Sequence, residues 1–438
     1  MTAFAQPLPH PDLSNLDRRF AAAMARLGPF ETSPHLAIGV SGGADSTALC
    51  LLADRWARAR GGRVSALIVD HALRAEAADE AQTTAVRLRA FGIEATILTW
   101  RGGKPSAGIQ HAARVARYGL LRDWCRGAGV LHLLCAHHAG DQMETYLMRQ
   151  MRGGALGAAG MSAVIEFPEV RLLRPLLSVE RADLIHFLKS KGASWVEDPS
   201  NANEAFERVR MRQRLAADEG LVEMARAGLA QAGAGRIDLE RRVAEALAER
   251  VSIHPLGFAQ LDRGSFRGLS DQAAVGMLGR LVQSLGGAEY APQTARTRAL
   301  VNRLRSDEGF RGASLGRCRL LADVGGQVIL CRDRRGLPGA RAAADLFHID
   351  GWDGRFTIDL PRSLGFEAVV APLGPDGWRQ VPRDLRRECT VPQAAAMTLP
   401  ALFRGGELVA HGLENGGGGL KMRFRPKNSA AFIGFCIA

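Results

Sequence analysis

From residue 35 to about residue 148 the chain repeats one pattern, a short apolar run followed by a longer amphipathic run. The apolar runs predict strands at 35–40, 63–69, 94–100 and 130–136. The amphipathic runs predict helices at about 46–60, 76–91, 109–126 and 141–152. Because strand–helix–strand units of this kind pair their strands in parallel and cover both faces of the sheet, we expect an α/β fold with a parallel sheet.

Polar residues follow each of the four predicted strands. These clusters are Ser41–Ser46, Asp70–Arg74, Trp100–Lys104 and His137–Thr145. The carboxyl ends of parallel strands lie at one edge of a sheet, and that edge is where ligands bind in open α/β folds. The sequence therefore predicts that four separate clusters meet in one site.

The first cluster, SGGADS at 41–46, predicts a phosphate or pyrophosphate site. Paired glycines let the backbone turn tightly and present bare N–H groups, and the predicted helix that follows adds its N-terminal dipole. An ordinary glycine turn is the alternative interpretation, but Asp45 and the flanking serines argue against it. No GK[ST] sequence is present, so the loop is not that of a γ-phosphate hydrolase.

Further candidates come from helical spacing. His137 and Asp141 are four residues apart at the start of a predicted helix, so they project from one face and can meet a common ligand. Arg114 and Arg117 also share a face, although a solvated helix surface is the alternative. We expect His132, inside its strand, to be structural.

The chain changes character after residue 175. Residues 219–305 show helical periodicity, whereas short strand-like runs separated by glycine-rich turns follow residue 306. We expect three domains, at 20–215, 216–305 and 306–438. Arginines alternate at 208, 210, 212 and 214, which favours either RNA phosphate contacts or solvent-exposed charge.

Composition limits the class of partner. The 57 basic and 45 acidic residues leave a net charge of +12, which favours a polyanionic partner. The seven cysteines include no CxxC pair, so we expect reduced thiols and no thiolate metal site. The N-terminus does not resemble a secretory signal, and no apolar stretch approaches the roughly 20 residues that span a bilayer. We expect a cytoplasmic protein without a membrane partner.

Together these motifs resemble a known family. SGGADS resembles the pyrophosphate loop of the PP-loop ATP pyrophosphatases. The other motifs resemble the tRNA(Ile)-lysidine synthetases in type and order; they are DHALR at 70–74, HAARVARY at 111–118, AHHAGDQMET at 136–145, RGG at 152–154, RPLL at 174–177 and EDPSN at 197–201. The resemblance implies a Rossmann-like PP-loop N-terminal domain, a helical linker domain and a small α+β C-terminal domain.

The resemblance also implies an activity: ATP and Mg²⁺ adenylate the wobble cytidine of tRNA(Ile) with a CAU anticodon, and free L-lysine then displaces AMP to form lysidine. It implies roles for individual residues. The resemblance assigns catalytic roles to Asp45, Arg117, His137 and Asp141, and makes Asp45 the Mg²⁺ ligand as well. It assigns nucleotide binding to Ser41, Gly42, Gly43, Asp45, Ser46, Asp70 and His71. It assigns substrate binding to Arg74, Glu144, Arg208 and Arg212.

Two positions depart from the family pattern. Gly140 stands where an acidic or amide residue is usual, and Val209 stands where the family has Asn. Two other functions are the alternatives: a tRNA thiolation ligase of the same superfamily, against which the missing cysteine pair argues, and a non-catalytic nucleotide- or RNA-binding protein. Homodimer formation is left open.

Overall fold

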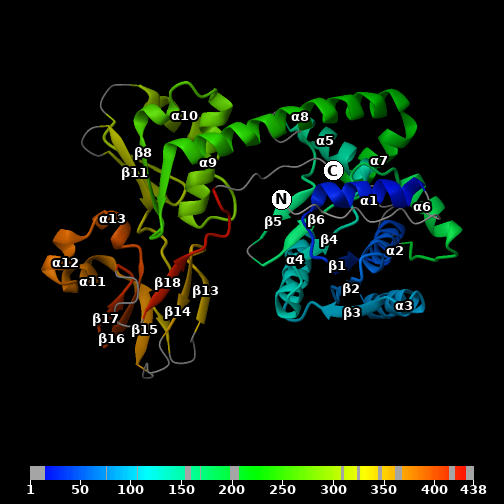
Figure 1. Ribbon diagram of the computed structural model, residues 1–438, viewed down its shortest axis with the longest axis horizontal. Coiled ribbons are helices and arrows are strands. Elements are labelled where there is room, and N and C mark those ends of the chain that lie inside the picture. The colour runs from blue at the N-terminus through cyan, green and yellow to red at the C-terminus, as the bar shows by residue number, and fades with distance from the viewer. Residues whose placement is uncertain are drawn as a thin grey trace. The chain divides into compact units, whose positions relative to one another are not determined.

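The computed structural model of the protein describes most of the chain. The described residues are 15–74, 76–105, 107–152, 159–167, 169–197, 207–306, 310–322, 326–343, 348–360, 367–413 and 420–430. Contacts within the chain define two compact units, of which the first ends at Ile237 and the second begins at Asp238 (Figure 1). The domain boundaries predicted at 215/216 and 305/306 stay predictions.

The first unit contains a six-stranded sheet in the order β3-β2-β1-β4-β6-β5. Its strands are β1 (His35–Val40), β2 (Arg63–Asp70), β3 (Glu94–Thr99), β4 (His132–Leu134), β5 (Val164–Glu166) and β6 (Arg171–Leu173). Strands β3, β2, β1, β4 and β6 are parallel, and β5 pairs antiparallel with β6. The four predicted strands are therefore confirmed, and they form the parallel sheet.

Helices cover both faces of this sheet. The described helices before residue 219 are α1 (Asn15–Leu27), α2 (Ala44–Arg58), α3 (Ala77–Ala90), α4 (Ile109–Ala128), α5 (Ala139–Met151), α6 (Arg181–Ser190) and α7 (Glu207–Ala217). Of these, α5 and α7 pack against each other. Alternate residues of β1 serve the two faces, with Leu36 and Ile38 packing in the core that includes α1, α2, α3 and α6, and Ala37 packing in the core that includes α4. This burial on both faces explains the nearly continuous apolar runs.

The strand order places a topological switch point beside β1. The chain leaves β1 toward β2 on one side and later returns to β4 on the other, so the segments after β1 and β4 diverge at the carboxyl edge. Such a divergence opens a crevice for a ligand in doubly wound sheets.

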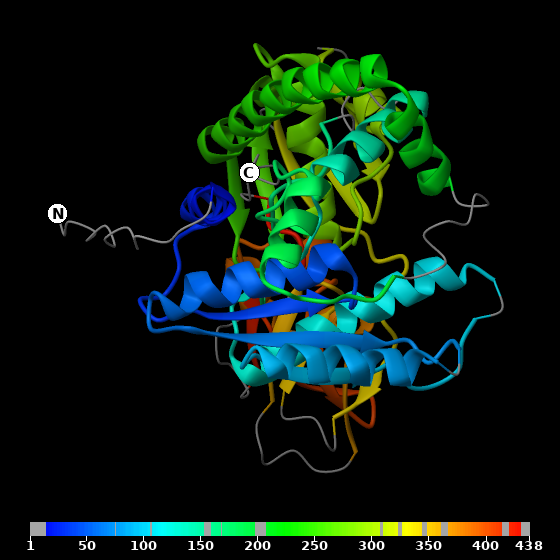
Figure 2. The same ribbon diagram turned by 90° about the vertical axis from the view of Figure 1, so that its right-hand side faces the viewer.

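Helix α8 (Glu219–Arg250) spans 32 residues, is the long green helix of Figure 2, and contains the division between the two units at Ile237 and Asp238. The second unit has three antiparallel sheets, in the orders β7-β8-β11-β10-β9, β12-β15-β16-β17 and β13-β14-β18. Its strands are β7 (Val251–His254), β8 (Phe258–Asp262), β9 (Ala313–Leu315), β10 (Cys318–Ala322), β11 (Gln327–Arg332), β12 (Arg341–Ala342), β13 (His348–Trp352), β14 (Phe356–Asp359), β15 (Ala368–Pro372), β16 (Pro400–Arg404), β17 (Glu407–His411) and β18 (Lys421–Phe424). Its helices are the 3₁₀-helix η2 (Arg263–Phe266), α9 (Asp271–Gly286), α10 (Thr294–Arg305), α11 (Gly374–Gln380), α12 (Arg383–Glu388) and α13 (Gln393–Ala396).

The helical structure predicted over 219–305 is wrong at 251–262, where β7 and β8 pair as antiparallel strands. Strand β8 pairs with β11, whose residues lie more than 60 positions later in the chain, with Leu261 opposite Val328. Helices α9 and α10 pack on this sheet, and Leu300 and Leu320 share one apolar core. The predicted 305/306 boundary falls inside that core. None of the described helices could cross a membrane.

Candidate active site

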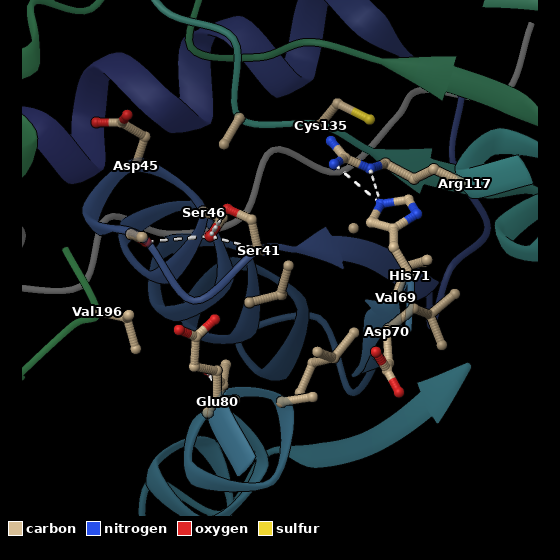
Figure 3. Close-up of a pocket in the computed structure, with 18 of the residues that line it drawn as sticks. Ser41, Asp45, Ser46, Val69, Asp70, His71, Glu80, Arg117, Cys135 and Val196 are labelled. Carbon is tan, nitrogen blue, oxygen red and sulfur yellow. Dashed lines mark hydrogen bonds between the residues drawn. The ribbon is translucent and has the colours of Figure 1, made fainter. Parts of the chain in front are cut away.

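A cavity of about 940 Å³ opens at the carboxyl ends of β1, β2 and β4 (Figure 3). Its volume lies within the range of small-molecule sites, about 300–1,000 Å³. Predicted site residues that line it are Ser41, Gly43, Asp45, Ser46, Asp70, His71, Arg74, Arg117 and His137. Three of the four strand-end clusters thus contribute to one cavity wall. The remaining cluster, the described residues Trp100–Lys104, does not line the cavity. Its Trp100 ring contacts His71 edge-on, at 6.2 Å between the ring centroids.

The loop after β1 is shaped by its glycines. Gly42 has φ +83°, and a Cβ atom there would lie 2.6 Å from Thr84 Oγ1, so both conformation and space require glycine. Gly43 is the N-cap of α2 and supplies no side-chain cap. The first amides of α2 are therefore available to an anion rather than satisfied by the protein.

Hydrogen bonds hold this loop closed. The Ser41 amide donates to Ser46 Oγ at 3.1 Å, and Ser46 Oγ donates to the Gly43 carbonyl at 3.0 Å. The Val196 amide donates to the Gly42 carbonyl at 2.9 Å, which ties the loop to the segment after α6. The loop is consequently fixed before any ligand binds. Gly42 itself does not line the cavity, so it serves the turn.

Asp45 follows the loop on the first turn of α2. Its Oδ1 lies 3.3 Å from Arg181 Nε, and its Oδ2 lies 3.7 Å from His138 Nε2. The described residues contain no group of three or more His, Cys, Asp or Glu placed to hold a metal ion. One carboxylate beside a phosphate site nevertheless fits Mg²⁺, which proteins usually bind through one or two carboxylates plus substrate phosphates. Asp45 Oδ1 accepts no hydrogen bond from the described residues and is paired with the Arg181 guanidinium, a positive charge whose place Mg²⁺ could take.

His138, the second histidine of the His137–Thr145 cluster, lies between Asp45 and Asp141. It is the N-cap of α5, and its Nδ1 accepts the Gly140 amide at 3.1 Å, which leaves the ring proton on Nε2. That Nε2 lies 3.6 Å from Asp141 Oδ2 as well as 3.7 Å from Asp45 Oδ2. Asp141 in turn accepts the His138 amide at 3.0 Å. One imidazole thus faces two carboxylates from different helices.

The opposite wall of the cavity comes from β2 and α4. Figure 3 shows His71 and Arg117 facing each other across from Ser41, Ser46 and Asp45, and Arg117 Nε donates to His71 Nε2 at 3.3 Å. Burial and the Arg117 charge lower the pKa of His71. Asp70 Oδ1 accepts the Ala72 amide at 2.8 Å, so this carboxylate also shapes the turn after β2.

His137 lines the cavity beside Arg174, a buried residue of the RPLL motif. Arg174 Nε donates to His137 Nδ1 at 3.2 Å, which leaves the Nε2 proton available to a ligand. Burial and the Arg174 charge lower the pKa of His137 to about 3. His137 is therefore neutral near pH 7 and suits a hydrogen-bond donor better than a proton acceptor.

Other predicted residues lie outside the cavity wall, on α5 and α7. Arg212 Nε donates to Glu144 Oε1 at 2.8 Å, and Arg208 Nη2 donates to Thr145 Oγ1 at 3.1 Å. Glu144 is 1% exposed, and burial raises its pKa although Arg212 opposes the shift. These side chains form a polar link between two helices, on the same face of α5 as Asp141.

Sequence reasoning gave no role to three residues that the structure brings to the site. The sequence indicated Arg174 only as part of the RPLL motif. No motif or spacing in the sequence indicated a role for Arg181. Trp195, a partly buried aromatic residue, lines the cavity. Trp378 is instead buried in the second unit, at 9% exposure.

The fold and this loop define a PP-loop ATP-binding protein, and residues 13–219 match the family described as the PP-loop domain. Similar proteins extend the match beyond that domain. The tRNA(Ile)-lysidine synthase of Mesorhizobium japonicum is 38% identical over 79% of this chain and 76% of its own length. Those of Ruegeria pomeroyi and Rhizobium meliloti are 34% and 36% identical, over 87% and 79% of this chain and 90% and 77% of theirs. The chain belongs to the tRNA(Ile)-lysidine synthase family.

Family membership confirms the resemblance, the enzyme class and the use of ATP that the sequence motifs predicted. The α/β fold class is confirmed by the parallel sheet of the first unit and the antiparallel sheets of the second. The roles of individual residues stay predictions.

Proposed function

We propose that this chain acts in the cytoplasm to convert the wobble cytidine of tRNA(Ile) with a CAU anticodon into lysidine, using ATP, Mg²⁺ and free L-lysine. One observation supports the proposal most directly: in a chain of this family, the segments after β1, β2 and β4 line a single cavity. The Ser41–Ser46 loop lies at this cavity, and helix α2, which follows the loop, has no side-chain N-cap. The reaction has two steps, each of which needs charge to be stabilised in that cavity.

In the first step the cytosine O2 attacks the α-phosphorus of ATP, the bond to the β-phosphate breaks and pyrophosphate leaves. The amides of the Ser41–Ser46 loop and of the first turn of α2 bind the departing pyrophosphate. Arg117 and the Nε2 proton of His137 stabilise charge on the α-phosphate. Asp45 would hold Mg²⁺, which would supply positive charge to the phosphates.

In the second step the neutral ε-amine of lysine attacks C2, the C2–O2 bond breaks and AMP leaves with the oxygen. The attacking nitrogen must lose a proton. The lowered pKa of His137 argues against that residue as the acceptor, whereas the raised pKa of Glu144 favours a carboxylate on α5. We assign the contact with lysine to Asp141 or Glu144 of α5; because Arg212 holds Glu144 outside the cavity wall in the free protein, Glu144 takes this role only when that ion pair opens.

The test is nucleoside analysis of tRNA after incubation with the full chain, ATP, Mg²⁺ and L-lysine. Lysidine is expected in a tRNA(Ile) transcript with C at the wobble position, and not in the same transcript with U there. Omission of lysine should leave no lysidine. In a parallel incubation with a sulfur donor in place of lysine, incorporation of sulfur would instead indicate a thiolation ligase, and absence of any tRNA-dependent pyrophosphate release would indicate a binding protein.

A further inference from the structure

We propose that Arg181 is a second cation of the pyrophosphate site, which pairs with Asp45 in the free protein and moves onto the pyrophosphate when a ligand binds. This inference rests on the proposed binding of pyrophosphate by the Ser41–Ser46 loop. Arg181 belongs to none of the four strand-end clusters. It reaches the site from α6, 136 positions after Asp45 in the chain.

The position of Arg181 supports this role. Its side chain lines the same cavity as Ser41, Asp45 and Ser46, and it is 49% exposed. Helices α2 and α6 pack in one core, where Leu49 and Leu52 share a cluster with Leu184. This packing fixes the start of α6 against α2. The backbone of Arg181 is therefore held in place, while its long side chain can change conformation.

The contact with Asp45 is a weak restraint. Nε of Arg181 lies 3.3 Å from Asp45 Oδ1, yet that oxygen accepts no hydrogen bond from the described residues. The pair is thus an electrostatic contact without hydrogen-bond geometry, and the guanidinium can leave it at low cost. A cation on the Asp45 carboxylate would displace the guanidinium, which lines the same cavity as Ser41 and Ser46.

The placement on α6 points to an anion as well. Arg181 is the first residue of α6, where the helix dipole disfavours a positive charge. An anion at this point satisfies both the guanidinium and the helix terminus. A guanidinium binds phosphate oxygens in a bidentate manner, and Arg181 lies beside Asp45 and the Ser41–Ser46 loop. The pyrophosphate that this loop binds is therefore the part of ATP that Arg181 would contact, whereas AMP alone does not occupy the loop.

The primary test compares the binding of Mg²⁺-pyrophosphate and of AMP to the full chain by calorimetry. We expect Arg181→Gln to weaken pyrophosphate binding about tenfold or more, the loss typical of a charge-assisted contact, and to change AMP binding less than twofold. Arg181→Lys should retain part of the affinity. Arg226→Gln is the matched control, since Arg226 is 54% exposed, pairs with the neighbouring Glu180 at 3.0 Å and does not line the cavity.

A second measurement tests the exchange itself. In the presence of EDTA, Asp45→Asn should bind pyrophosphate more tightly than the wild type, because Arg181 is released. That gain should be largely lost in the Asp45→Asn/Arg181→Gln double variant. A gain of equal size in both backgrounds would overturn the exchange, because removal of the carboxylate alone would then explain it.

Three outcomes would overturn the proposal. If Arg181→Gln leaves the pyrophosphate affinity unchanged, the Arg181 side chain does not bind pyrophosphate. Equal losses for pyrophosphate and AMP, or a lowered melting temperature of both Arg181→Gln and Arg181→Lys, indicate a structural role. If the wild type does not bind pyrophosphate, the proposed loop function itself fails, which separates that failure from the failure of Arg181 alone.

Discussion

At His137 the protein fixes the charge of an imidazole in the site. Burial and Arg174 lower its pKa to about 3, whereas a histidine in the unfolded chain titrates near the ordinary 6.5. Between these two values the unfolded chain binds a proton that the folded chain does not. The free energy of unfolding therefore falls as the pH drops below 6.5. The stability that the protein gains by keeping His137 neutral is fully present only above that pH.

We predict that His137→Gln, which removes the titrating group, flattens this dependence. From pH 7 to pH 5 the wild type should lose roughly 2 kcal/mol more unfolding free energy than the variant, since each unit of difference in pKa is worth about 1.4 kcal/mol. Urea denaturation at the two pH values measures both proteins. Parallel losses would show that His137 is protonated freely in the folded state.

Gly140 matters because the His138 ring folds back over it. A Cβ atom at Gly140 would lie 2.9 Å from His138 Cε1, and the Gly140 amide is the donor that fixes the ring. We predict that Gly140→Ala turns the ring away from Asp45 and Asp141 and slows pyrophosphate release about tenfold, with a loss of ~1 kcal/mol in stability.

The control for this prediction is Gly127→Ala, a helical position in α4 where a Cβ meets nothing within 4 Å. It should leave pyrophosphate release unchanged and not lower stability, because alanine is the better helix former. Equal rates in the wild type and Gly140→Ala would mean that the orientation of His138 is not needed.

At the scale of elements, one ion pair joins α5 to α7. Glu144 is almost fully buried, and its Oε1 is paired with Arg212, whose side chain is 42% exposed. Removal of the cation leaves a buried carboxylate unpaired, which is costly, although solvent reaches the arginine and reduces the effect. The link matters because α5 also carries Asp141, which faces His138.

We predict that Arg212→Met lowers the free energy of unfolding by ~2 kcal/mol. Glu144→Gln in the Arg212→Met background should recover most of that loss, because the uncompensated charge is then absent. Chemical denaturation of the two variants and the wild type measures the effect. A double variant as unstable as Arg212→Met would indicate that packing, and not charge, holds the helices together.

For the whole molecule, the net charge of +12 bears on tRNA binding. Phosphate contacts release counterions, so affinity falls linearly on a log–log plot against salt concentration. We predict that tRNA binding weakens more than tenfold between 50 and 200 mM KCl, for a protein that makes about three or more phosphate contacts. Filter binding over a salt series gives the slope. An affinity that does not depend on salt would exclude the basic surfaces from binding.

The sequence alone determined the parallel sheet, the phosphate loop and the edge at which the site lies. This was possible because burial on both faces of a sheet leaves a local apolar pattern, and because strand ends carry the polar clusters. Gly42 shows the same principle at the residue scale, since a turn with positive φ beside Thr84 accepts only glycine.

Only the tertiary structure decided which distant side chains meet. The β7–β8 hairpin depends on pairing with β11, which local helical periodicity does not record. Glu144 and Arg212 bind each other behind the cavity wall instead of lining it, because α7 packs against α5. Arg181 reaches Asp45 because α2 and α6 share one core. Such contacts arise from the packing of segments far apart in the chain, and no local pattern encodes them.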